Sequence, residues 1–219
     1  MSETAQLPLA DVTEMASVHR VFRNALTDAP QLLGPAATDT DRAEIVGTYL
    51  DNVLHLLHVH HESEDECLTP RLVARGTADE VAEVTRIAAQ HDVVRPDIEA
   101  AAERIDGFRA QPSVDTAATL AGSLATLNAS LTAHLDEEET NAMPIAAKYI
   151  NVAEWGELPA HGLQNFTGDK IWLILGLIRE QMTQQQRDDM LAHMPPPVAE
   201  FWTGTGEQLF TDFMGTLRA

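Results

Sequence analysis

Apolar residues recur at three- and four-residue spacing along most of the chain, and strand-like alternation of Val, Ile, Thr and aromatic residues is nearly absent. This spacing places the apolar side chains on one face of an α-helix. The aromatic fraction of only 5%, together with many Ala and Leu residues, also favours helices over a β-sandwich or barrel. The sequence therefore predicts an all-α protein.

Residues 11–150 contain four such amphipathic segments with short connections, which predict an up-down-up-down four-helix bundle. The first helix is expected to begin after an Asp11 cap and to fade between residues 28 and 35. The other three are expected to run from residues 38–40 to Gly76, from 77–79 to Gly107, and from 113 to 149–151. Pro96 predicts a bend in the third helix just beyond His91, or a split of this helix into two elements.

Residues 151–219 differ in character and predict a C-terminal helical extension. We expect a linker around Trp155 to Gly162, helices beginning at Asp169 and Thr183, and a last amphipathic segment after the Pro195–Pro197 break. The chain thus divides into a bundle of residues 11–150 and an extension of residues 151–219. The extension is expected to pack on the bundle, on a second copy in a homodimer, or on another protein partner.

One histidine interrupts the apolar stripe of each bundle helix, and two of these histidines are followed by a glutamate at plus four. Residues three or four apart share a helix face, so each pair points inward. HHESEDECLTP from His60 and HLDEEETNAMP from His134 also align at the His, the Glu and a Pro at plus ten. The six inward residues are His19, His60, Glu64, His91, His134 and Glu138.

The helical register separates these six from the other polar residues nearby. Of the pairs His58/Glu62, His60/Glu64 and His61/Asp65, only the middle pair continues the apolar stripe of its helix. The remaining histidines and acidic residues are therefore predicted to lie at the surface or just outside the site. This second set comprises His55, His58, His61, His193, Glu62, Glu66, Glu137 and Glu139.

Four imidazoles and two carboxylates buried in one layer would cost several kcal/mol per ion without compensation. Metal cations remove that cost, and imidazole with carboxylate suits first-row metals such as Fe, Zn or Mn. Two carboxylates from separate helices can bridge a pair of metals. The alternative, in which each histidine is a hydrogen-bonded core residue, explains a single position such as His19 but not six inward positions together.

The formal charge of −20, with only 14 Lys plus Arg, argues against binding of nucleic acid or of anionic membranes. The longest apolar run, residues 171–178, is too short to span a bilayer, and the N-terminus shows no secretory signal pattern. The single cysteine, Cys67, excludes an internal disulfide. These observations predict a cytoplasmic protein.

The order H, HxxxE, H, HxxxE over residues 11–150 resembles the hemerythrin-like, or HHE cation-binding, family of non-haem di-iron proteins. The resemblance implies a four-helix bundle with two iron ions in an oxo- or hydroxo-bridged centre. The iron ligands it implies are His19, His60, Glu64, His91, His134 and Glu138, with the two glutamates bridging. The expected ligands are O2, peroxide or nitric oxide, and catalase-like peroxide disproportionation is an implied activity.

The sequence departs from oxygen-carrying hemerythrins at two places. Ile87 stands where they have a fifth histidine, four residues before that of the third helix. Their fourth helix carries HxxxxD, whereas here Glu138 stands at plus four and Glu139 at plus five from His134. One iron is thus expected to lack a histidine and to keep a position for water, peroxide, His161 or Tyr49. A different class of function is an iron- or oxygen-sensing module that signals through the C-terminal helices. A third is a purely structural bundle without metal.

Overall fold

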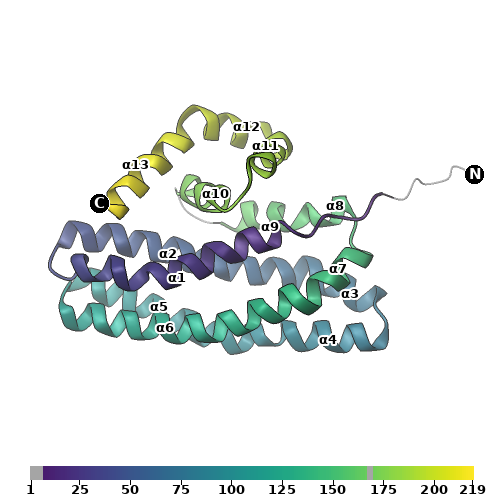
Figure 1. The fold of residues 1–219 in the computed structure, drawn as a ribbon, viewed down its shortest axis with the longest axis horizontal. Coiled ribbons are helices and arrows are strands. Elements are labelled where there is room, and N and C mark those ends of the chain that lie inside the picture. The colour runs from purple at the N-terminus through teal and green to yellow at the C-terminus, as the bar shows by residue number, and fades with distance from the viewer. Residues whose placement is uncertain (1–6, 167–169) are drawn as a thin grey trace, which may run out of the picture.

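The computed structural model describes residues 7–166 and 170–219, and in them it contains helices and no sheet (Figure 1). Four helical rods form an antiparallel bundle in which α1 contacts α2 and α6, and α5 contacts α2 and α6. The rods are α1 (Met15–Ala36); α2 (Thr40–Ser63), η1 (Glu64–Leu68) and α3 (Thr69–Arg75); α4 (Ala78–Ala88) and α5 (Gln90–Ala110); and α6 (Val114–Glu137), η2 (Glu138–Ala142) and α7 (Met143–Tyr149). The predicted all-α bundle is confirmed.

Side-chain caps begin three of the rods near the predicted positions. Asp39 accepts a hydrogen bond from the Arg42 backbone N–H, and Thr77 and Ser113 each form a capping box. The first rod differs from the prediction, because Asp11 caps only a short turn and α1 runs on through Pro30 and Pro35 to Ala36. Buried residues of α1 on both sides of these prolines offset the backbone bonds that they remove.

The interruption of the third rod does not lie at Pro96, where the sequence predicted a bend or a split. The third rod breaks at Ala89, between α4 and α5, and α5 continues through Pro96, which is exposed. The packing partners change at this point, because α4 lies against α3 and η2 whereas α5 lies against α2 and α6. The break therefore follows tertiary packing, and it lies immediately before His91.

The second and fourth rods each contain a π-helical segment that begins at a glutamate, Glu64 or Glu138. The N–H of Thr69 bonds to the Glu64 carbonyl, and that of Met143 bonds to the Glu138 carbonyl, five residues back in both cases. A proline follows each of these donors, and a proline ring clashes with the carbonyl four residues before it. The wider π turn relieves that clash, which gives the shared proline at plus ten a structural role.

The C-terminal helices cover one side of the bundle (Figure 1). They are α8 (Val152–Trp155), α9 (Glu157–Asn165), α10 (Ile171–Glu180), α11 (Gln184–His193), α12 (Pro196–Phe201), η3 (Trp202–Gly206) and α13 (Glu207–Arg218). The linker expected around Trp155 to Gly162 is instead mostly helical, because Asn151 caps α8 and Leu158 of α9 is buried. The predicted helix start at Asp169 lies outside the described residues.

Helix α2 is the bundle helix that the extension covers most. It contacts α9, α10 and α13 in addition to its bundle neighbours α1 and α5. As a result, α2 is buried on more than a single stripe. The division into a domain of residues 11–150 and an extension of residues 151–219 stays a prediction.

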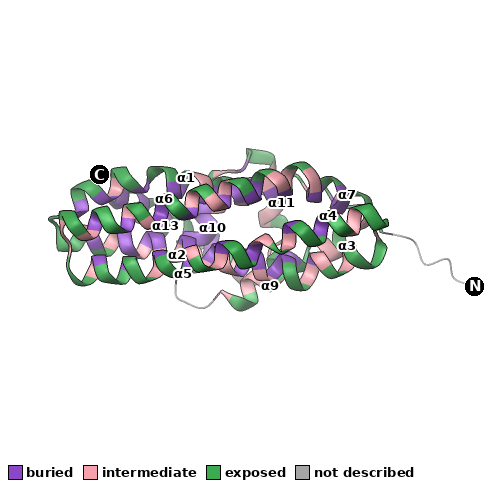
Figure 2. Cartoon of the chain, turned by 90° about the horizontal axis from the view of Figure 1, so that it is seen from below, coloured by how far each residue is buried: buried purple, intermediate pink, exposed green. Residues whose placement is uncertain are grey.

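The hydrophobic core consists of two clusters, and the predicted ligand level lies between them. Figure 2 shows that buried residues lie mostly on the sides of the bundle helices that face one another. On each rod the inward histidine stands between a residue of the larger cluster and one of the smaller. The flanking residues are Val21 and Met15 around His19, Leu57 and Leu68 around His60, Val94 and Ile87 around His91, and Leu131 and Ala142 around His134. The polar layer is therefore walled by apolar side chains at both ends.

Gly176 allows α10 and α13 to pack closely, because a Cβ at this position would overlap the ring of Phe210. We expect Gly176→Ala to lower the free energy of unfolding by about 1–3 kcal/mol through overpacking. Gly34→Ala is the matched control, since nothing lies within 4 Å of its added Cβ, and alanine in a helix is favoured by about 0.5–1 kcal/mol. Urea unfolding of both variants measures the difference, and equal midpoints would contradict the close packing.

Candidate metal centre

The structure brings the six predicted residues together at one level of the bundle. Helix α1 supplies His19, α5 supplies His91, and the α2–η1 and α6–η2 junctions each supply one His/Glu pair. The exposed fractions are His19 0%, His60 8%, Glu64 2%, His91 4%, His134 2% and Glu138 4%. Polar side chains this deeply buried need partners for their charges and lone pairs.

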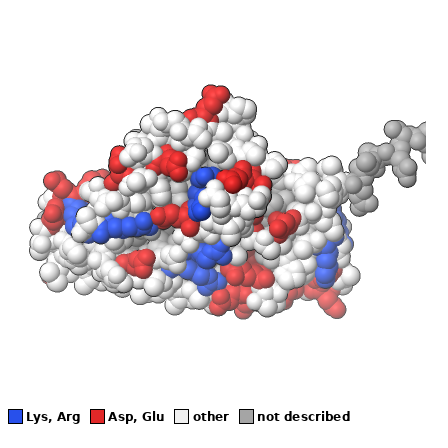
Figure 3. Space-filling view, turned by 45° about the horizontal axis from the view of Figure 1, so that its top comes forward, with Lys and Arg blue, Asp and Glu red and all other residues white. Residues whose placement is uncertain are grey.

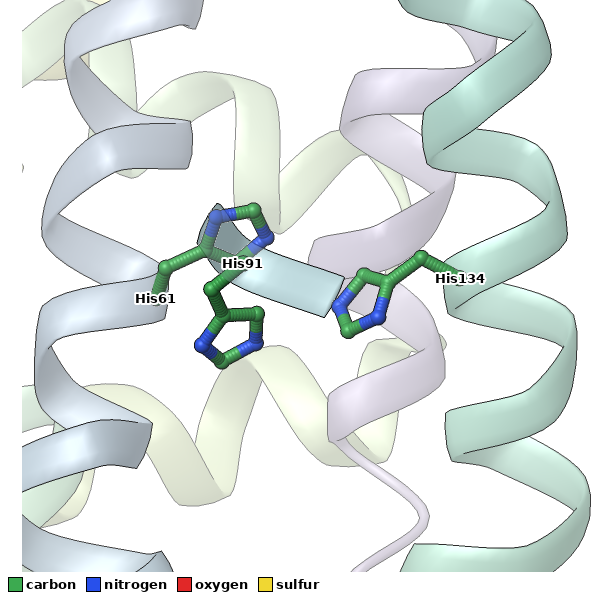
Figure 4. Close-up of side chains that lie close together, drawn as sticks. All are labelled: His61, His91 and His134. Atoms are coloured by element: carbon green, nitrogen blue, oxygen red, sulfur yellow. The ribbon is translucent and has the colours of Figure 1, made fainter. Parts of the chain in front are cut away.

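Together with His61, the six residues form two neighbouring groups that are each compact enough to hold a metal ion. One group contains His19, His60, Glu64 and Glu138, and the other contains His61, His91 and His134; within each, the candidate ligand atoms lie within 4.8 Å of one another. Figure 4 shows the three imidazoles of the second group converging on the space between their helices.

The two glutamates of the first group also approach imidazoles of the second group. Oε1 of Glu64 is 3.4 Å from Nε2 of His60, and its Oε2 is 3.5 Å from Nε2 of His91. Oε2 of Glu138 is 3.4 Å from Nε2 of His19 and 3.7 Å from Nε2 of His134. Each carboxylate therefore touches one imidazole of each group, as a carboxylate shared by two cations would.

Hydrogen bonds at Nδ1 orient three of the imidazoles. His19 donates to Glu139 at 2.8 Å, His91 donates to Asp65 at 2.9 Å, and His134 donates to the side-chain oxygen of Gln90 at 3.0 Å. The two acidic partners each follow directly after a central glutamate in the sequence. With Nδ1 as donor, the lone pair of each ring is on Nε2, which points into the layer.

The central atoms of the layer have no hydrogen-bond partner. Among the described residues, nine buried side-chain nitrogen or oxygen atoms are unpaired, and seven of them belong to this cluster: Nε2 of His19, His60, His61 and His134, both carboxylate oxygens of Glu64, and Oε2 of Glu138. Burial raises the pKa of Glu64 and, with neighbouring imidazoles, lowers the pKa values of His60 and His61. Metal cations fit this donor set, because they would accept the lone pairs and neutralise the carboxylates.

His61 was expected at the surface or just outside the site, and the structure excludes the surface position. Its side chain is only 5% exposed, and its ring stacks on that of His91 with 4.2 Å between centroids. The helical register did not predict the burial of His61, because it assumes one inward face whereas α2 is covered on several sides. The apolar run VLHLLHV before His60 was the available signal, since it indicates a helix buried nearly all round.

The other residues of that second set lie outside the layer. His55 packs on the ring of Phe166, His58 pairs with Glu62 near the surface, and His193 is exposed. Glu139 supports His19, and Glu137 accepts hydrogen bonds from Arg86 and Gln90, the residue that in turn supports His134. Both glutamates thus lie just outside the buried site.

Neither His161 nor Tyr49 joins the two groups. His161 of α9 hydrogen-bonds with Ser63 at 2.9 Å and with Glu66 at 3.2 Å. Tyr49 precedes His60 on the same helix by about 16 Å along the axis, and burial raises the pKa of its phenol. His161 therefore contacts the residue beside Glu64 rather than the layer itself.

The pKa of His134 gives a prediction for the metal-free protein. Burial lowers this pKa from 6.5 to about 4, so the unfolded chain takes up a proton between pH 6.5 and 4 that the folded chain does not. The fold is therefore destabilised as the pH falls through this window, by up to about 3 kcal/mol from this group. Unfolding of metal-free wild type and His134→Gln from pH 7 to pH 4 tests it, and parallel stability curves would contradict it.

The fold and the polar layer define a class of protein, a helical bundle whose core can hold metal cations. The sequence model of the Hemerythrin HHE cation binding domain matches residues 10–146, more than half of the chain. The chain belongs to the hemerythrin HHE cation-binding domain family. Searches of the curated proteins and of the solved structures gave no match.

None of the described helices is both long and apolar enough to cross a membrane. On the face in Figure 3, Lys and Arg side chains lie among Asp and Glu side chains. A cytoplasmic location stays a prediction.

Proposed function

We propose that this chain is a non-haem di-iron protein that binds or reacts with O2, peroxide or nitric oxide. The proposed iron ligands are His19, His60, Glu64, His91, His134 and Glu138. The observation that carries the proposal is the set of seven unpaired nitrogen and oxygen atoms that face one another in a closed layer. When bound, two irons would supply Lewis-acid and redox chemistry at this level of the bundle.

The residues around the layer restrict what can react there. Apolar clusters wall it at both ends, and the cavity beside it, between α2 and α5, has a volume of only about 10 Å³. That is room for about one water molecule. A space of this size fits diatomic or peroxide-sized ligands.

The experiment is metal analysis of the purified protein, followed by optical spectra with O2, hydrogen peroxide and nitric oxide. We expect two irons per chain and a visible spectrum that responds to at least one of these ligands. Oxygen evolution from peroxide, abolished by His134→Ala, would assign catalase-like activity. Iron-loaded protein that is inert to all three ligands would overturn the proposal.

A second candidate function is a sensor of iron or oxygen that signals through the C-terminal helices. The observation that favours it is the hydrogen bond from α9 to Ser63, the residue before Glu64, together with the packing of α10 and α13 on α2. Limited proteolysis of the C-terminal helices, with and without iron, tests this function. Equal cleavage rates would count against it.

A carboxylate that accepts a hydrogen bond from a ligand imidazole is expected to affect the iron affinity. Glu139→Gln removes the charged acceptor for His19 but keeps the shape of the side chain, so we expect iron affinity to fall about 10–100-fold. Glu66→Gln is the control, because Glu66 is 68% exposed and its carboxylate bonds to His161 of α9, which lies outside the layer. Iron competition with a chromogenic chelator measures both, and equal affinities would show that Glu139 does not support a ligand.

A further inference from the structure

We propose that His61 of α2 is a fifth histidine ligand of the metal centre. It would take the place of the fifth histidine of oxygen-carrying hemerythrins, at whose position this sequence has Ile87. This inference rests on the proposed di-iron function and adds a residue to it. It also changes which metal keeps a free position for a small ligand.

The surroundings of His61 are those of a ligand rather than of a core residue. Its side chain is 5% exposed, and its Nε2 atom has no hydrogen-bond partner. Its ring stacks on His91, with planes 12° apart, and meets His134 edge-on at 5.2 Å between centroids (Figure 4). A histidine with only a packing role would leave that nitrogen unsatisfied, which is unfavourable in a buried position, whereas a shared cation would bind all three rings.

Consecutive residues of one helix can serve both groups because they point about 100° apart around its axis. His60 turns toward α1, where its ring lies 5.1 Å from that of His19, and His61 turns toward α5 and His91. α2 lies between α1 and α5 in the bundle. The adjacent pair therefore supplies one imidazole to each side.

Ile87 lies outside the layer for a structural reason. It precedes the break at Ala89 and is buried in the smaller apolar cluster, among residues such as Met15 and Val84. A histidine there would sit in an apolar environment. The imidazole is supplied across the α2–α5 interface instead.

The inference makes the two metal positions unequal. His61, His91 and His134 give one metal three imidazoles, while His19 and His60 give the other two. The missing imidazole that the sequence predicted for one iron would then come from His61, at the metal held by His91 and His134. The position open to a small ligand would belong to the metal held by His19 and His60.

The cavity between α2 and α5 provides the test. It is lined by His58, His61, Glu62, Asp65, His91, Arg95 and Ile98. Removing the His61 imidazole would join this space to the metal layer, leaving a site that free imidazole can fill. His58→Ala is the matched control, because His58 lines the same cavity from the same helix but has a side chain that is 43% exposed.

The experiment compares iron content and optical and Mössbauer spectra of wild type, His61→Ala and His58→Ala, each with and without imidazole. For His61→Ala we expect loss of one iron or a changed signal for one of two irons, and restoration by imidazole. His58→Ala should match wild type. If His61→Ala matches His58→Ala in all readouts, the role of His61 is overturned while the di-iron function stands; if wild type takes up no iron, the proposed function itself fails.

A measurement on wild type keeps the inference testable if His61→Ala does not fold. Zinc-loaded protein with 15N-labelled histidine reports by NMR which imidazole nitrogens bind metal. We expect five metal-bound rings, His19, His60, His61, His91 and His134, against four if His61 is only a packing residue. A metal-free signal from His61 would overturn the inference.

Discussion

Replacing either central glutamate with glutamine is expected to reduce the iron content from two ions per chain to one or none. Each carboxylate lies within 3.4–3.7 Å of an imidazole from both groups, so each is positioned to be shared by the two metals. An amide has no negative charge with which to neutralise buried cations. Glu64→Gln and Glu138→Gln should both show the loss, because the two pairs occupy equivalent places in the second and fourth rods.

Iron analysis and the visible spectrum measure this effect. Glu62→Gln is the control, since Glu62 lies two residues before Glu64 on the same helix but pairs with His58 at the surface. The glutamine variants should remain folded, because a neutral side chain removes a buried charge. Full iron content with an unchanged spectrum in Glu64→Gln would show that this carboxylate is not a shared ligand.

Removing the metal from wild type is expected to lower the melting temperature by about 10 °C. A cation present at about 1,000 times its dissociation constant stabilises the folded state by about 4 kcal/mol, and for a chain of this size each kcal/mol shifts the melting temperature by about 2–4 °C. The physical source is the layer itself, in which seven buried nitrogen and oxygen atoms lack a hydrogen-bond partner among the described residues.

Calorimetry of chelator-treated and reloaded protein gives the shift directly. Reloading should restore the melting temperature, and Glu138→Gln should show a smaller difference between its two forms because it holds less metal. Equal melting temperatures with and without two bound irons would mean that the layer is satisfied without cations. That result would favour the hypothesis that the histidines are core residues of a structural bundle without metal.

The sequence by itself determined the all-α bundle and the six residues that meet in its core. Helical periodicity is a local property: once Leu57 and Leu131 face the core, His60 and His134 must follow at three residues, and Glu64 and Glu138 at four more. Capping chemistry is equally local, which is why the starts at Asp39, Thr77 and Ser113 could be read directly. The assignment of the six residues as iron ligands stays a prediction.

Only the tertiary structure decided where His61, Ala89 and the segment around α9 would lie. His61 is buried because α5 packs on a side of α2 that would face solvent if α2 had only one buried face. No local sequence pattern indicates which helix packs on that side. The third rod breaks at Ala89 because its packing partners change, although Pro96 carries the stronger local signal. Residues 157–165 are helical where a linker was expected, and their packing on α2 explains why. Each of these outcomes depends on the burial of one helix by another, which the sequence of a single segment does not contain.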